Sequence, residues 1–361
     1  MTERTLPTVD VIVLLYKNAQ FMPALFAGLA ELDCARDCLT LHLVDNGPGD
    51  GTLAEAGLQM EKFADRLPKT IIHEPGRNLG FTSGNNLAMR QALERNADYV
   101  YLLNGDAAFE PRALAEVVKA AEADQRIGAV QSLLVLQQNP DEINSWGNAL
   151  HYLGFGYACG YHRKRNEAPR DVTEIAYPSG AGVLLRSSVL RKIGLFDDIF
   201  IAYHEDLDLG WRIRLAGFRC VLAPQSVVRH HYEFSRSIQK WYWMERNRFL
   251  TLLKNYKIAT LIWLTPQIVL SELALFVFAV FKGWWWDKLR VYAYLLRPAT
   301  WRYLSEQRRV IDSFRQVKDR TILELTAPTI AYQDVESWPV KIILNPIGRA
   351  LHWLTKIVVF W

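Results

Sequence analysis

Three carboxylates crowd into four consecutive positions of this chain, at Glu205, Asp206 and Asp208. They open a helical pattern that ends at Gly217. Like charges at this spacing repel each other, and the apolar positions of the pattern would form a helix without them. Acidic side chains in a first turn complement the helix dipole, which is the simpler explanation. The alternative is that the start of the helix holds an ionised carboxylate in a cleft, where it acts as a general base.

Two adjacent histidines, His230 and His231, follow in the same stretch of sequence, Phe196–Ser235. Imidazole nitrogen is a common ligand of divalent metals, so this pair is a candidate part of a metal site. A lone histidine is more often structural, and the residues of this stretch alone leave both interpretations open.

The chain before this stretch alternates between strand and helix patterns. Strands are predicted at Val9–Leu15, Leu39–Val44, Thr70–His73 and Tyr99–Leu103. Helical patterns follow through Phe21, Leu25 and Leu29, after Thr52, and from Ser83 to Glu94. Strands that alternate with helices predict a parallel sheet with right-handed crossovers.

Polar residues collect where these strands end. They are Tyr16, Asp45, Asn46, Arg77, Asn78, Asn104 and Asp106. Ligands of such sheets bind outside the carboxyl ends of the strands. A single polar residue there is ordinary turn chemistry, but several at one edge indicate a binding site. No GxGxxG follows the first strand and no GxxxxGK[ST] occurs, so neither a dinucleotide-binding fold nor a P-loop enzyme fits.

Composition narrows the class of protein further. The net charge of +4 over 361 residues argues against a bulk nucleic-acid binder. The four cysteines lack metal-type spacing, which predicts reduced thiols in a cytoplasmic protein. The segment MTERTLPTVD has charges before the first apolar run and no small-residue cleavage site after one, so we expect no secretory signal.

The C-terminal part differs in character, since ten of the twelve tryptophans lie at or beyond Trp241. Ile258–Phe281 is long enough to span a bilayer and carries one formal charge, Glu272. Residues 282–361 hold 13 Lys and Arg against 7 Asp and Glu, and a single span would expel this basic tail from the cytoplasm. We therefore expect an in-plane or re-entrant pair of helices.

The last stretch, Val340–Trp361, predicts an amphipathic helix at a membrane surface. Its basic and polar face comprises Lys341, Asn345, Arg349, His352 and Lys356. Its apolar face comprises Ile343, Ile347, Leu351, Leu354 and Val358. The alternative is a core helix that packs on the catalytic domain or on a second subunit. The predicted domains are a catalytic domain at 1–250 and a helical, membrane-associating region at 251–361.

Five motifs within residues 8–254 give the chain its resemblance to a known family. They are VDNGPGDGT (44–52), RNLGFTSGNN (77–86), LLNGD (102–106), SGAG (179–182) and the block 194–231 around the crowded carboxylates. In this order they resemble the family 2 glycosyltransferases, and they are most similar to the rhamnosyltransferase and galactofuranosyltransferase-like branch. The resemblance implies an α/β, GT-A-type nucleotide-sugar fold with a mixed central sheet, followed here by the C-terminal helical region.

The resemblance also implies roles for particular residues. Asp206 resembles the catalytic base of an inverting transfer, with Glu205 and Asp208 in acceptor-contacting or supporting roles. Asp45 resembles the acid that binds the nucleotide base, and the Tyr16 loop lines the ribose. The implied nucleotide-sugar residues are Tyr16, Asp45, Arg77, Asn78 and Asn104.

The implied metal ligands are Asp106 and His230, with Mg²⁺ or Mn²⁺ as the ion. Asn104 stands where the first acid of the DxD motif is usual, and Gly105 stands where proline or aspartate is common, which leaves the nucleotide preference open. Arg246 and Arg248 could grip a diphosphate or lie on a solvated helix face.

Together these features predict an inverting, metal-dependent glycosyltransferase. It would move one sugar, first of all rhamnose from dTDP-rhamnose, to a lipid-linked or polysaccharide acceptor of a bacterial cell-surface glycan. The predicted partners are the nucleotide sugar, the acceptor and a membrane surface at the cytoplasmic face of the inner membrane, with homo-oligomer formation open and no nucleic acid.

Three alternatives have weaker support. A processive polysaccharide synthase would carry QxxRW, which is absent. A sugar-nucleotide pyrophosphorylase would need a glycine-rich basic loop where the sequence is LLYKNAQ. A non-catalytic membrane-bound scaffold would not need both Asp106 and Asp206.

Overall fold

The computed structural model describes residues 6–232, 241–329 and 345–361. The chain forms two compact units. The first comprises Met1–Asn148, Ala158–Ile213 and Phe218–Tyr232, and the second comprises Ala149–Tyr157, Arg214–Gly217 and Glu233–Trp361.

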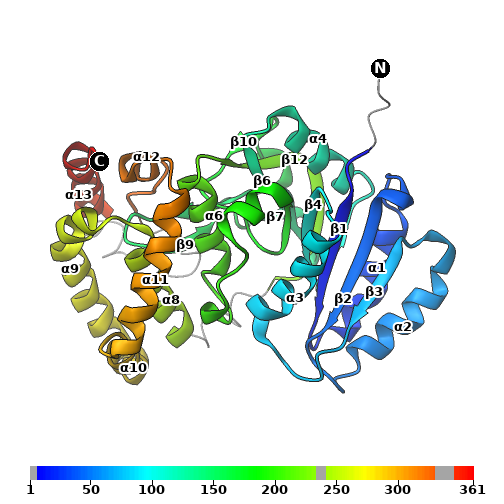
Figure 1. The fold of residues 1–361 in the computed structure, drawn as a ribbon, viewed down its shortest axis with the longest axis horizontal. Coiled ribbons are helices and arrows are strands. Elements are labelled where there is room, and N and C mark those ends of the chain that lie inside the picture. The colour runs from blue at the N-terminus through cyan, green and yellow to red at the C-terminus, as the bar shows by residue number, and fades with distance from the viewer. Residues whose placement is uncertain (1–5, 233–240, 330–344) are drawn as a thin grey trace. The chain divides into compact units, whose positions relative to one another are not determined.

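The first unit is built on a mixed sheet in the order β10-β12-β6-β11-β4-β1-β2-β3, with β5 paired to β12 and β7 to β6 (Figure 1). The strands are β1 Val9–Leu15, β2 Leu39–Asp45, β3 Lys69–His73, β4 Tyr99–Asn104, β5 Ala107–Phe109, β6 Ile127–Leu136, β7 Asn139–Ser145, β10 Thr173–Glu174, β11 Gly182–Arg186 and β12 Arg219–His230. Strands β8, Asn148–Leu150, and β9, Gly156–Ala158, pair with each other. The four strands predicted from the sequence are the parallel set β1 to β4. Strand β11 runs antiparallel to both β4 and β6, which makes the sheet mixed.

Six helices accompany this sheet within the described residues: α1 Met22–Ala30, α2 Thr52–Lys62, α3 Gly80–Glu94, α4 Ala113–Ala123, α5 Ser187–Ile193 and α6 Glu205–Leu215. One face of β1, Val9, Val11, Val13 and Leu15, joins the core cluster formed with α1 and α4. Helix α3 covers the opposite face, since a Cβ at Gly84 would lie 2.6 Å from the Leu14 side chain. Burial of such side chains on both faces, at roughly 1.5–3 kcal/mol each, explains the nearly unbroken apolar runs of these strands.

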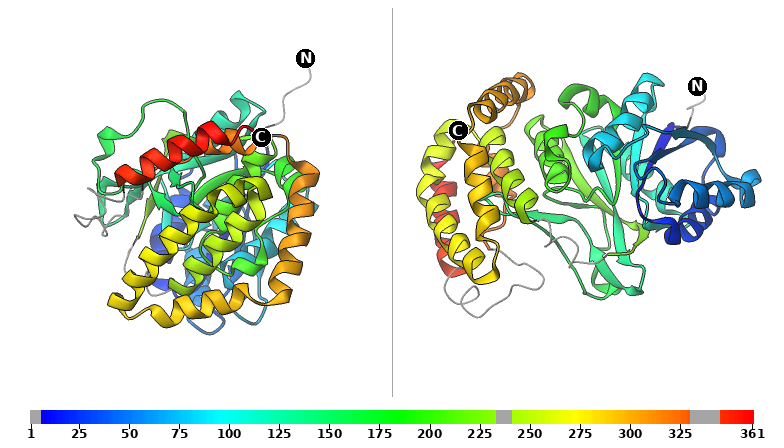
Figure 2. Two further views of the ribbon diagram at one scale, coloured as in Figure 1. Left: turned by 90° about the vertical axis from the view of Figure 1, so that its left-hand side faces the viewer. Right: turned by 90° about the horizontal axis from the view of Figure 1, so that it is seen from below.

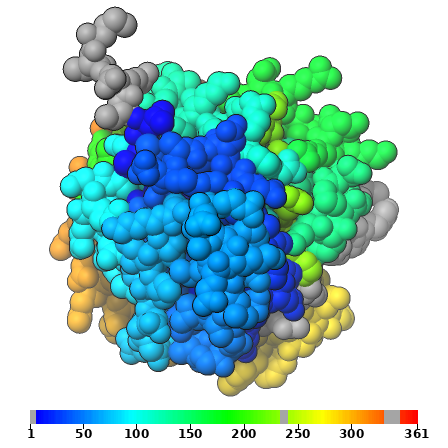
Figure 3. Space-filling view, turned by 90° about the vertical axis from the view of Figure 1, so that its right-hand side faces the viewer, coloured from blue at the N-terminus to red at the C-terminus, as the bar shows by residue number. Residues whose placement is uncertain are grey.

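Figure 3 views the first unit from the side of α2 and the edge strand β3, whose residues are drawn in blue. The side chains of this edge strand are exposed or half-buried, and none is fully buried. The central strands β1, β2 and β4, in contrast, are buried along almost their whole length. The predicted site residues at the ends of β1, β2 and β4 therefore project from rigid elements.

The second unit is helical (Figure 2). Its helices are α8 Trp241–Asn255, α9 Ile258–Lys282, α10 Trp285–Leu295, α11 Pro298–Phe314, α12 Asp319–Glu324 and α13 Asn345–Val358. Helix α9 is the one helix in the described ranges whose length and composition would allow it to cross a membrane, a test that core helices also pass.

A buried ionic cluster joins three of these helices. Arg248 of α8 pairs with Glu245 and with Glu272 of α9, and Lys288 of α10 lies 2.6 Å from both carboxylates. Arg246 and Arg248 are 5 % and 0 % exposed. The interpretation of these arginines as a solvated helix face is therefore wrong. Both are buried, and Arg248 forms an ion pair with Glu272, the single acid of α9.

The helix α13 begins at Asn345, so Lys341 and Ile343 of the predicted amphipathic face lie outside the described residues. His352 was expected on an exposed basic face, and that expectation is wrong. Its ring is buried, with Nε2 at 2.9 Å from Thr326 Oγ1 and its centroid 5.1 Å from that of Tyr152. Packing of α13 against α12 and the 149–157 segment buries His352, although helical spacing alone predicted that it would be exposed to solvent.

Candidate active site

The carboxyl ends of β1, β2 and β4 lie side by side. Leu15 pairs with Asp45 and Leu14 pairs with Asn104, so Tyr16, Asp45 and Asn104 belong to the same edge of the sheet. From β1 the chain proceeds to β2 on one side and later to β4 on the other. Open α/β sheets bind ligands at the edge where the strand order reverses in this way.

The two loops predicted to hold the nucleotide touch each other. The Asp45 carboxylate is buried and accepts a hydrogen bond from Gly47 N at 3.3 Å. The Tyr16 ring is 45 % exposed and lies against Gly47, where a Cβ would be 3.1 Å from the ring. An exposed aromatic ring beside a buried carboxylate can stack on a base or ribose while the acid accepts from a base N–H group.

The loop after β3 is tied to the end of β2. Asn46 Oδ1 accepts from Leu79 N at 2.7 Å, and Asn46 Nδ2 donates to Asn78 Oδ1 at 3.2 Å. Asn78 Oδ1 also accepts from Gly80 N. Asn78 thus fixes the loop conformation, whereas Arg77 beside it is exposed.

Gly105 occupies a position where any side chain would collide with the β1 loop. A Cβ there would lie 1.8 Å from Asn18 Nδ2 and 2.9 Å from the carbonyl oxygen of Leu14. Asn18 in turn orients Tyr16, because its Oδ1 accepts from Tyr16 N at 3.2 Å. The departure from proline or aspartate at residue 105 is therefore matched to the packing of this chain.

Gly105→Ala is expected to destabilise the protein by about 1–3 kcal/mol, since the added methyl must displace the Asn18 amide. The free energy of unfolding from urea titrations measures this. Gly57→Ala is the matched control, because a Cβ at that helical glycine meets no atom within 4 Å and should stabilise by about 0.5–1 kcal/mol. Equal stability of the two variants would contradict the steric explanation.

The two predicted metal ligands lie together at this edge. Strands β5 and β12 pair antiparallel with Ala107 opposite His230, and this places His230 Nε2 at 3.3 Å from Asp106 Oδ1. The Asn104 amide lies 3.4 Å from the same ring nitrogen. His231 donates its backbone N–H to the Asp106 carbonyl, and its ring packs against that of Phe21 in a tilted arrangement, with centroids 4.7 Å apart.

Asn144 on β7, which sequence reasoning missed, orients His230. Its side chain is buried, and its Oδ1 lies 2.9 Å from His230 Nδ1. When Nδ1 carries the proton, the lone pair of Nε2 faces the Asp106 carboxylate. Two acceptors that face each other at 3.3 Å are stabilised by a cation or a proton between them, so the donor set fits a divalent ion.

Electrostatics at Asp106 favour the charged form. Burial alone would raise the pKa of this carboxyl. With a proton rather than a metal ion between Asp106 and His230 Nε2, the hydrogen bond and the charge of His230 outweigh burial and hold the pKa of Asp106 below its ordinary value. The described part of the chain holds no group of three or more His, Cys, Asp or Glu side chains placed to share a metal. A bound ion would therefore need further oxygen ligands from a diphosphate or from water.

Asn144→Ala is expected to weaken metal binding about 10- to 100-fold, because the imidazole of His230 loses the acceptor that fixes its orientation. Titration with Mn²⁺ followed by electron paramagnetic resonance measures the affinity. Asn144→Asp keeps an acceptor oxygen and should bind as the wild type or more tightly. A loss in both variants of similar size would point to a folding defect instead.

Asp206 begins α6 next to the SGAG turn. Its Oδ1 accepts from Leu207 N at 2.7 Å, and its Oδ2 accepts from Gly180 N at 3.4 Å. The turn belongs to the same edge of the sheet, since Asn104 N donates to Ala181 O. Gln131, buried on β6, fixes the turn by accepting from Ser179 N at 2.7 Å.

Burial raises the pKa of the Asp206 carboxyl to about 6, although hydrogen bonds from Leu207 N and Gly180 N oppose the rise. A carboxylate that titrates near neutral pH suits a general base. Among the three crowded acids Asp206 alone keeps partial exposure, because Glu205 and Asp208 are buried.

Asp208 has a structural role in the described contacts. It is fully buried and accepts from Arg212 Nε at 2.9 Å, one helical turn away. The same guanidinium donates to the carbonyl oxygens of Ile193 and Leu195. This network anchors α6 to the segment after α5 and so fixes the start of the helix where Asp206 lies.

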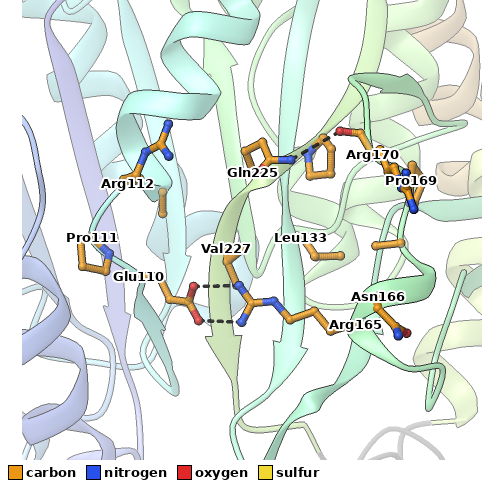
Figure 4. Close-up of a pocket in the computed structure, with 13 residues that line it drawn as sticks. Glu110, Pro111, Arg112, Leu133, Arg165, Asn166, Pro169, Arg170, Gln225 and Val227 are labelled. Atoms are coloured by element: carbon orange, nitrogen blue, oxygen red, sulfur yellow. Dashed lines mark hydrogen bonds and ion pairs between the residues drawn. The ribbon is translucent and has the colours of Figure 1, made fainter.

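A separate cavity of about 430 Å³ lies beside β5 and β12 (Figure 4). None of the predicted site residues lines it. Figure 4 shows the Arg165 guanidinium crossing the cavity to make two hydrogen bonds with Glu110, at 3.1 and 2.9 Å. The predicted site is instead the open edge of the sheet, where the strand-end residues meet.

A mixed sheet with two acids and a histidine at the carboxyl edge of its strands is the arrangement expected of a glycosyltransferase of the GT-A fold. Residues 55–249, more than half of the chain, match a family model described as glycosyltransferase like family 2. The chain belongs to this family, and the predicted membership is confirmed. Glycosyltransferase activity follows from this membership.

Among curated proteins the chain is similar to the N-acetylglucosaminyl-diphospho-decaprenol L-rhamnosyltransferase of two Mycobacterium tuberculosis strains. The identity is 28 % over 230 residues, which cover 58 % of this chain and 72 % of that protein. This relative supports the predicted rhamnosyltransferase-like branch.

Among solved structures the chain is similar to GalNAc-T7 with UDP, GalNAc and Mn²⁺, with a TM-score of 0.55 and 14 % identity. The match covers 70 % of this chain and 48 % of the other, so the chain spans about half the length of that protein. At this identity the likeness concerns the fold, and the predicted GT-A-type fold is confirmed.

Proposed function

We propose that this glycosyltransferase is inverting and metal-dependent, and that it transfers one sugar from a nucleotide sugar to a lipid-linked or polysaccharide acceptor. The observation that carries the proposal is the pair of unlike sites at one sheet edge. One is Asp206, a partly exposed carboxylate whose pKa lies at about 6. The other is Asp106 with His230, an oriented oxygen and nitrogen donor pair.

The roles follow from these positions. Tyr16, Asp45, Arg77, Asn78 and Asn104 bind the nucleotide sugar, Glu205 supports the acceptor side, and Asp208 anchors the start of α6 through Arg212. Asp106 and His230 hold Mg²⁺ or Mn²⁺, which supplies positive charge that stabilises the departing diphosphate. Residues 1–250 form the catalytic domain under this proposal, and residues 251–361 form the membrane-associating region.

The reaction is a single displacement at the anomeric carbon. The Asp206 carboxylate takes the proton of the acceptor hydroxyl while that oxygen bonds to the anomeric carbon. The bond from this carbon to the diphosphate oxygen breaks, and the electron pair leaves with the nucleoside diphosphate. One base on the face opposite the leaving group gives inversion and needs no covalent nucleophile.

The named relative suggests the substrates. Its acceptor, by its name, is N-acetylglucosaminyl diphosphate on decaprenol, and the sugar added is L-rhamnose. We expect dTDP-rhamnose as the donor here and an acceptor of the same polyprenyl diphosphate class. Incubation of the full chain with a panel of nucleotide sugars and a polyprenyl-diphosphate acceptor, with and without a chelator, tests this.

The expected result is metal-dependent release of nucleoside diphosphate from one donor, with a product of inverted anomeric configuration by NMR. Retention of configuration would refute the single displacement. Failure to bind any nucleoside diphosphate in the presence of metal would refute the transferase proposal for this site.

The membrane surface in this proposal is the exposed apolar side of the second unit. Its members are Ile258, Ile262, Val269, Leu270, Leu273, Val277, Val280 and Phe281 on α9, Trp285, Trp286 and Leu289 on α10, and Ile347, Trp353, Leu354 and Ile357 on α13. Between the helices polar contacts are also buried, since Gln267 of α9 donates to Thr355 of α13. An apolar outer surface with exposed tryptophans, on helices joined by buried polar contacts, suits the interface of a bilayer.

Glu272 favours an in-plane position for α9, because its ion pairs with Arg248 and Lys288 bind the middle of this helix to α8 and α10. Docking would occur at the cytoplasmic face of the inner membrane. Leu273→Glu with Val277→Glu should abolish flotation with phosphatidylethanolamine–phosphatidylglycerol vesicles. Leu58→Glu is the matched control, since Leu58 is 60 % exposed on α2 and Leu273 is 62 % exposed. Concentration-dependent self-association of the wild type without vesicle binding would assign this face to an oligomer.

A further inference from the structure

Asn86 on α3 is fully buried and makes three hydrogen bonds to one distant segment. Its Nδ2 donates to Phe196 O and to Asp198 Oδ1, both at 2.8 Å. Its Oδ1 accepts from Phe196 N at 3.1 Å. Its exposed fraction is 1 %. A buried amide with three such bonds holds its partners in one geometry, because loss of any bond would leave a buried polar group unsatisfied.

Neighbouring residues of α3 hold the same segment. Ser83 Oγ donates to Asp198 Oδ1 at 2.8 Å, and Arg90 lies 3.5 Å from Asp198 Oδ2. The backbone N–H groups of Phe81 and Thr82 both donate to the carbonyl oxygen of Ile201, at 2.8 and 3.2 Å. The first two turns of α3 therefore grip residues 196–201 along their length.

The backbone at residues 201–204, which follows the segment held by α3, is strained. Ile201, Tyr203 and His204 have φ values of +63°, +68° and +68°, which non-glycine residues rarely adopt. Such conformations cost free energy and persist where the surroundings enforce them. Asp206 follows only two residues after His204, so its position depends on this enforced turn.

The start of α3 and Asp206 both lie beside Gly180 of the SGAG turn. A Cβ at Gly180 would lie 3.5 Å from the Phe81 ring and 4.0 Å from the Cβ of Asp206. At its beginning α3 follows the loop that Asn46 binds through Leu79 N and Gly80 O. The start of α3 thus lies between two predicted parts of the site. One is the loop at Leu79 and Gly80 beside the predicted nucleotide-binding residues, and the other is the 196–204 segment that precedes Asp206.

We infer that Asn86, acting with Asp198, is a positioning residue that sets the Asp206 carboxylate by enforcing the strained 201–204 turn. This inference rests on the proposed role of Asp206 as the base. Asn86 is buried away from the surface, so its loss should act on the chemical step and leave donor binding intact.

Asn86→Ala is expected to lower kcat about 10- to 100-fold, since a shift of the base by about 1 Å is enough for such a loss. KM for the donor should stay within about threefold of the wild-type value. Asn85→Ala is the matched control. Asn85 is 3 % exposed on the same helix, but its side chain donates to Phe81 O within α3. This variant should lose some stability and keep kcat.

A second pair of variants covers the case in which Asn86→Ala fails to fold. The Asp198 side chain is half exposed, so Asp198→Ala should fold, and it should lower kcat in the same direction by about tenfold. Asp198→Asn keeps an acceptor oxygen for Asn86 and Ser83 and should restore most of the activity. A merely structural role would not separate these two variants.

Hydrogen exchange provides a readout that does not depend on transfer activity. Amides of residues 199–206 should exchange at least about tenfold faster in Asn86→Ala and Asp198→Ala than in the wild type or Asn85→Ala. If the variants show this difference in exchange but the wild-type protein transfers no sugar, the proposed function is refuted, whereas the positioning of the 201–204 turn by Asn86 and Asp198 is supported. Equal exchange and equal kcat in Asn86→Ala, Asp198→Ala and Asn85→Ala would overturn the inference.

Discussion

Replacement of Asp206 by asparagine is expected to lower the rate of sugar transfer about 1,000-fold. The amide has nearly the shape of the carboxylate but cannot take the proton of the acceptor hydroxyl, and a positioned base contributes a factor of about 10²–10⁴. Donor binding should be unchanged, because Asp206 contacts the SGAG turn and not the strand ends that carry Tyr16 and Asp45. Single-turnover assays at saturating donor, together with calorimetric titration of the nucleoside diphosphate, measure both quantities.

The wild-type enzyme should lose activity as the pH falls through about 6, with unit slope, because Asp206 must be ionised to act. The same pKa predicts a stability effect. The folded-state pKa lies above the unfolded value of 3.8, so folding favours the protonated form. Ionisation of Asp206 therefore lowers the free energy of unfolding. This destabilisation is absent below the unfolded pKa of 3.8 and grows as the pH rises to about 6.

Asp206→Asn removes this cost and should stabilise the protein at pH 8 by up to about 3 kcal/mol. The gain should be smaller at pH 5, where most of the folded wild type carries the proton. Urea unfolding at the two pH values measures the difference. Asp206 is not the base if Asp206→Asn retains transfer activity within tenfold of the wild type. The same holds if its residual activity falls below about pH 6 as that of the wild type does.

Asp106→Ala is expected to abolish metal-dependent binding of nucleoside diphosphate, with Kd raised at least about 100-fold. The variant loses the carboxylate that faces His230 Nε2 at 3.3 Å, and a lone imidazole is a weak site for Mg²⁺ or Mn²⁺. Calorimetric titration with the diphosphate, in Mn²⁺ and in chelator, measures the change. In chelator the wild type and the variant should bind alike.

His231→Ala serves as the neighbouring control. Its ring packs against Phe21, with centroids 4.7 Å apart, so its removal should leave the metal-dependent affinity within about threefold of wild type. His230→Ala, in contrast, should weaken binding as Asp106→Ala does. If Asp106→Ala binds the diphosphate with unchanged metal dependence, the ion is held elsewhere and the assignment of this pair is wrong.

The sequence determined much of the fold. Apolar β-branched runs predicted β1 with its observed bounds, and β2, β3 and β4 each with one further residue at an end. For β1, β2 and β4 this works because burial on both faces of a parallel strand demands such residues. It also follows that Asp45 and Asn104 meet at one edge, since carboxyl ends of parallel strands lie together.

The environment of each site residue depended on partners far away in the sequence. Asn144 lies 86 positions before His230, and nothing in the residues around it distinguishes it from other hairpin residues. The interaction between Asn86 and Phe196 spans 110 positions. Pattern and spacing describe neighbours along one element, whereas these contacts arise from the packing of separate elements.

The second unit makes the same division clear. Spacing predicted an amphipathic α13 but placed His352 on the exposed face, and the structure buries it against Thr326. The sequence by itself determined the family, the meeting of polar residues at the strand ends and the apolar character of α9. Only the tertiary structure decided which of the three carboxylates stays accessible and titrates near pH 6, because desolvation depends on every atom that surrounds a group and not on its neighbours in the chain.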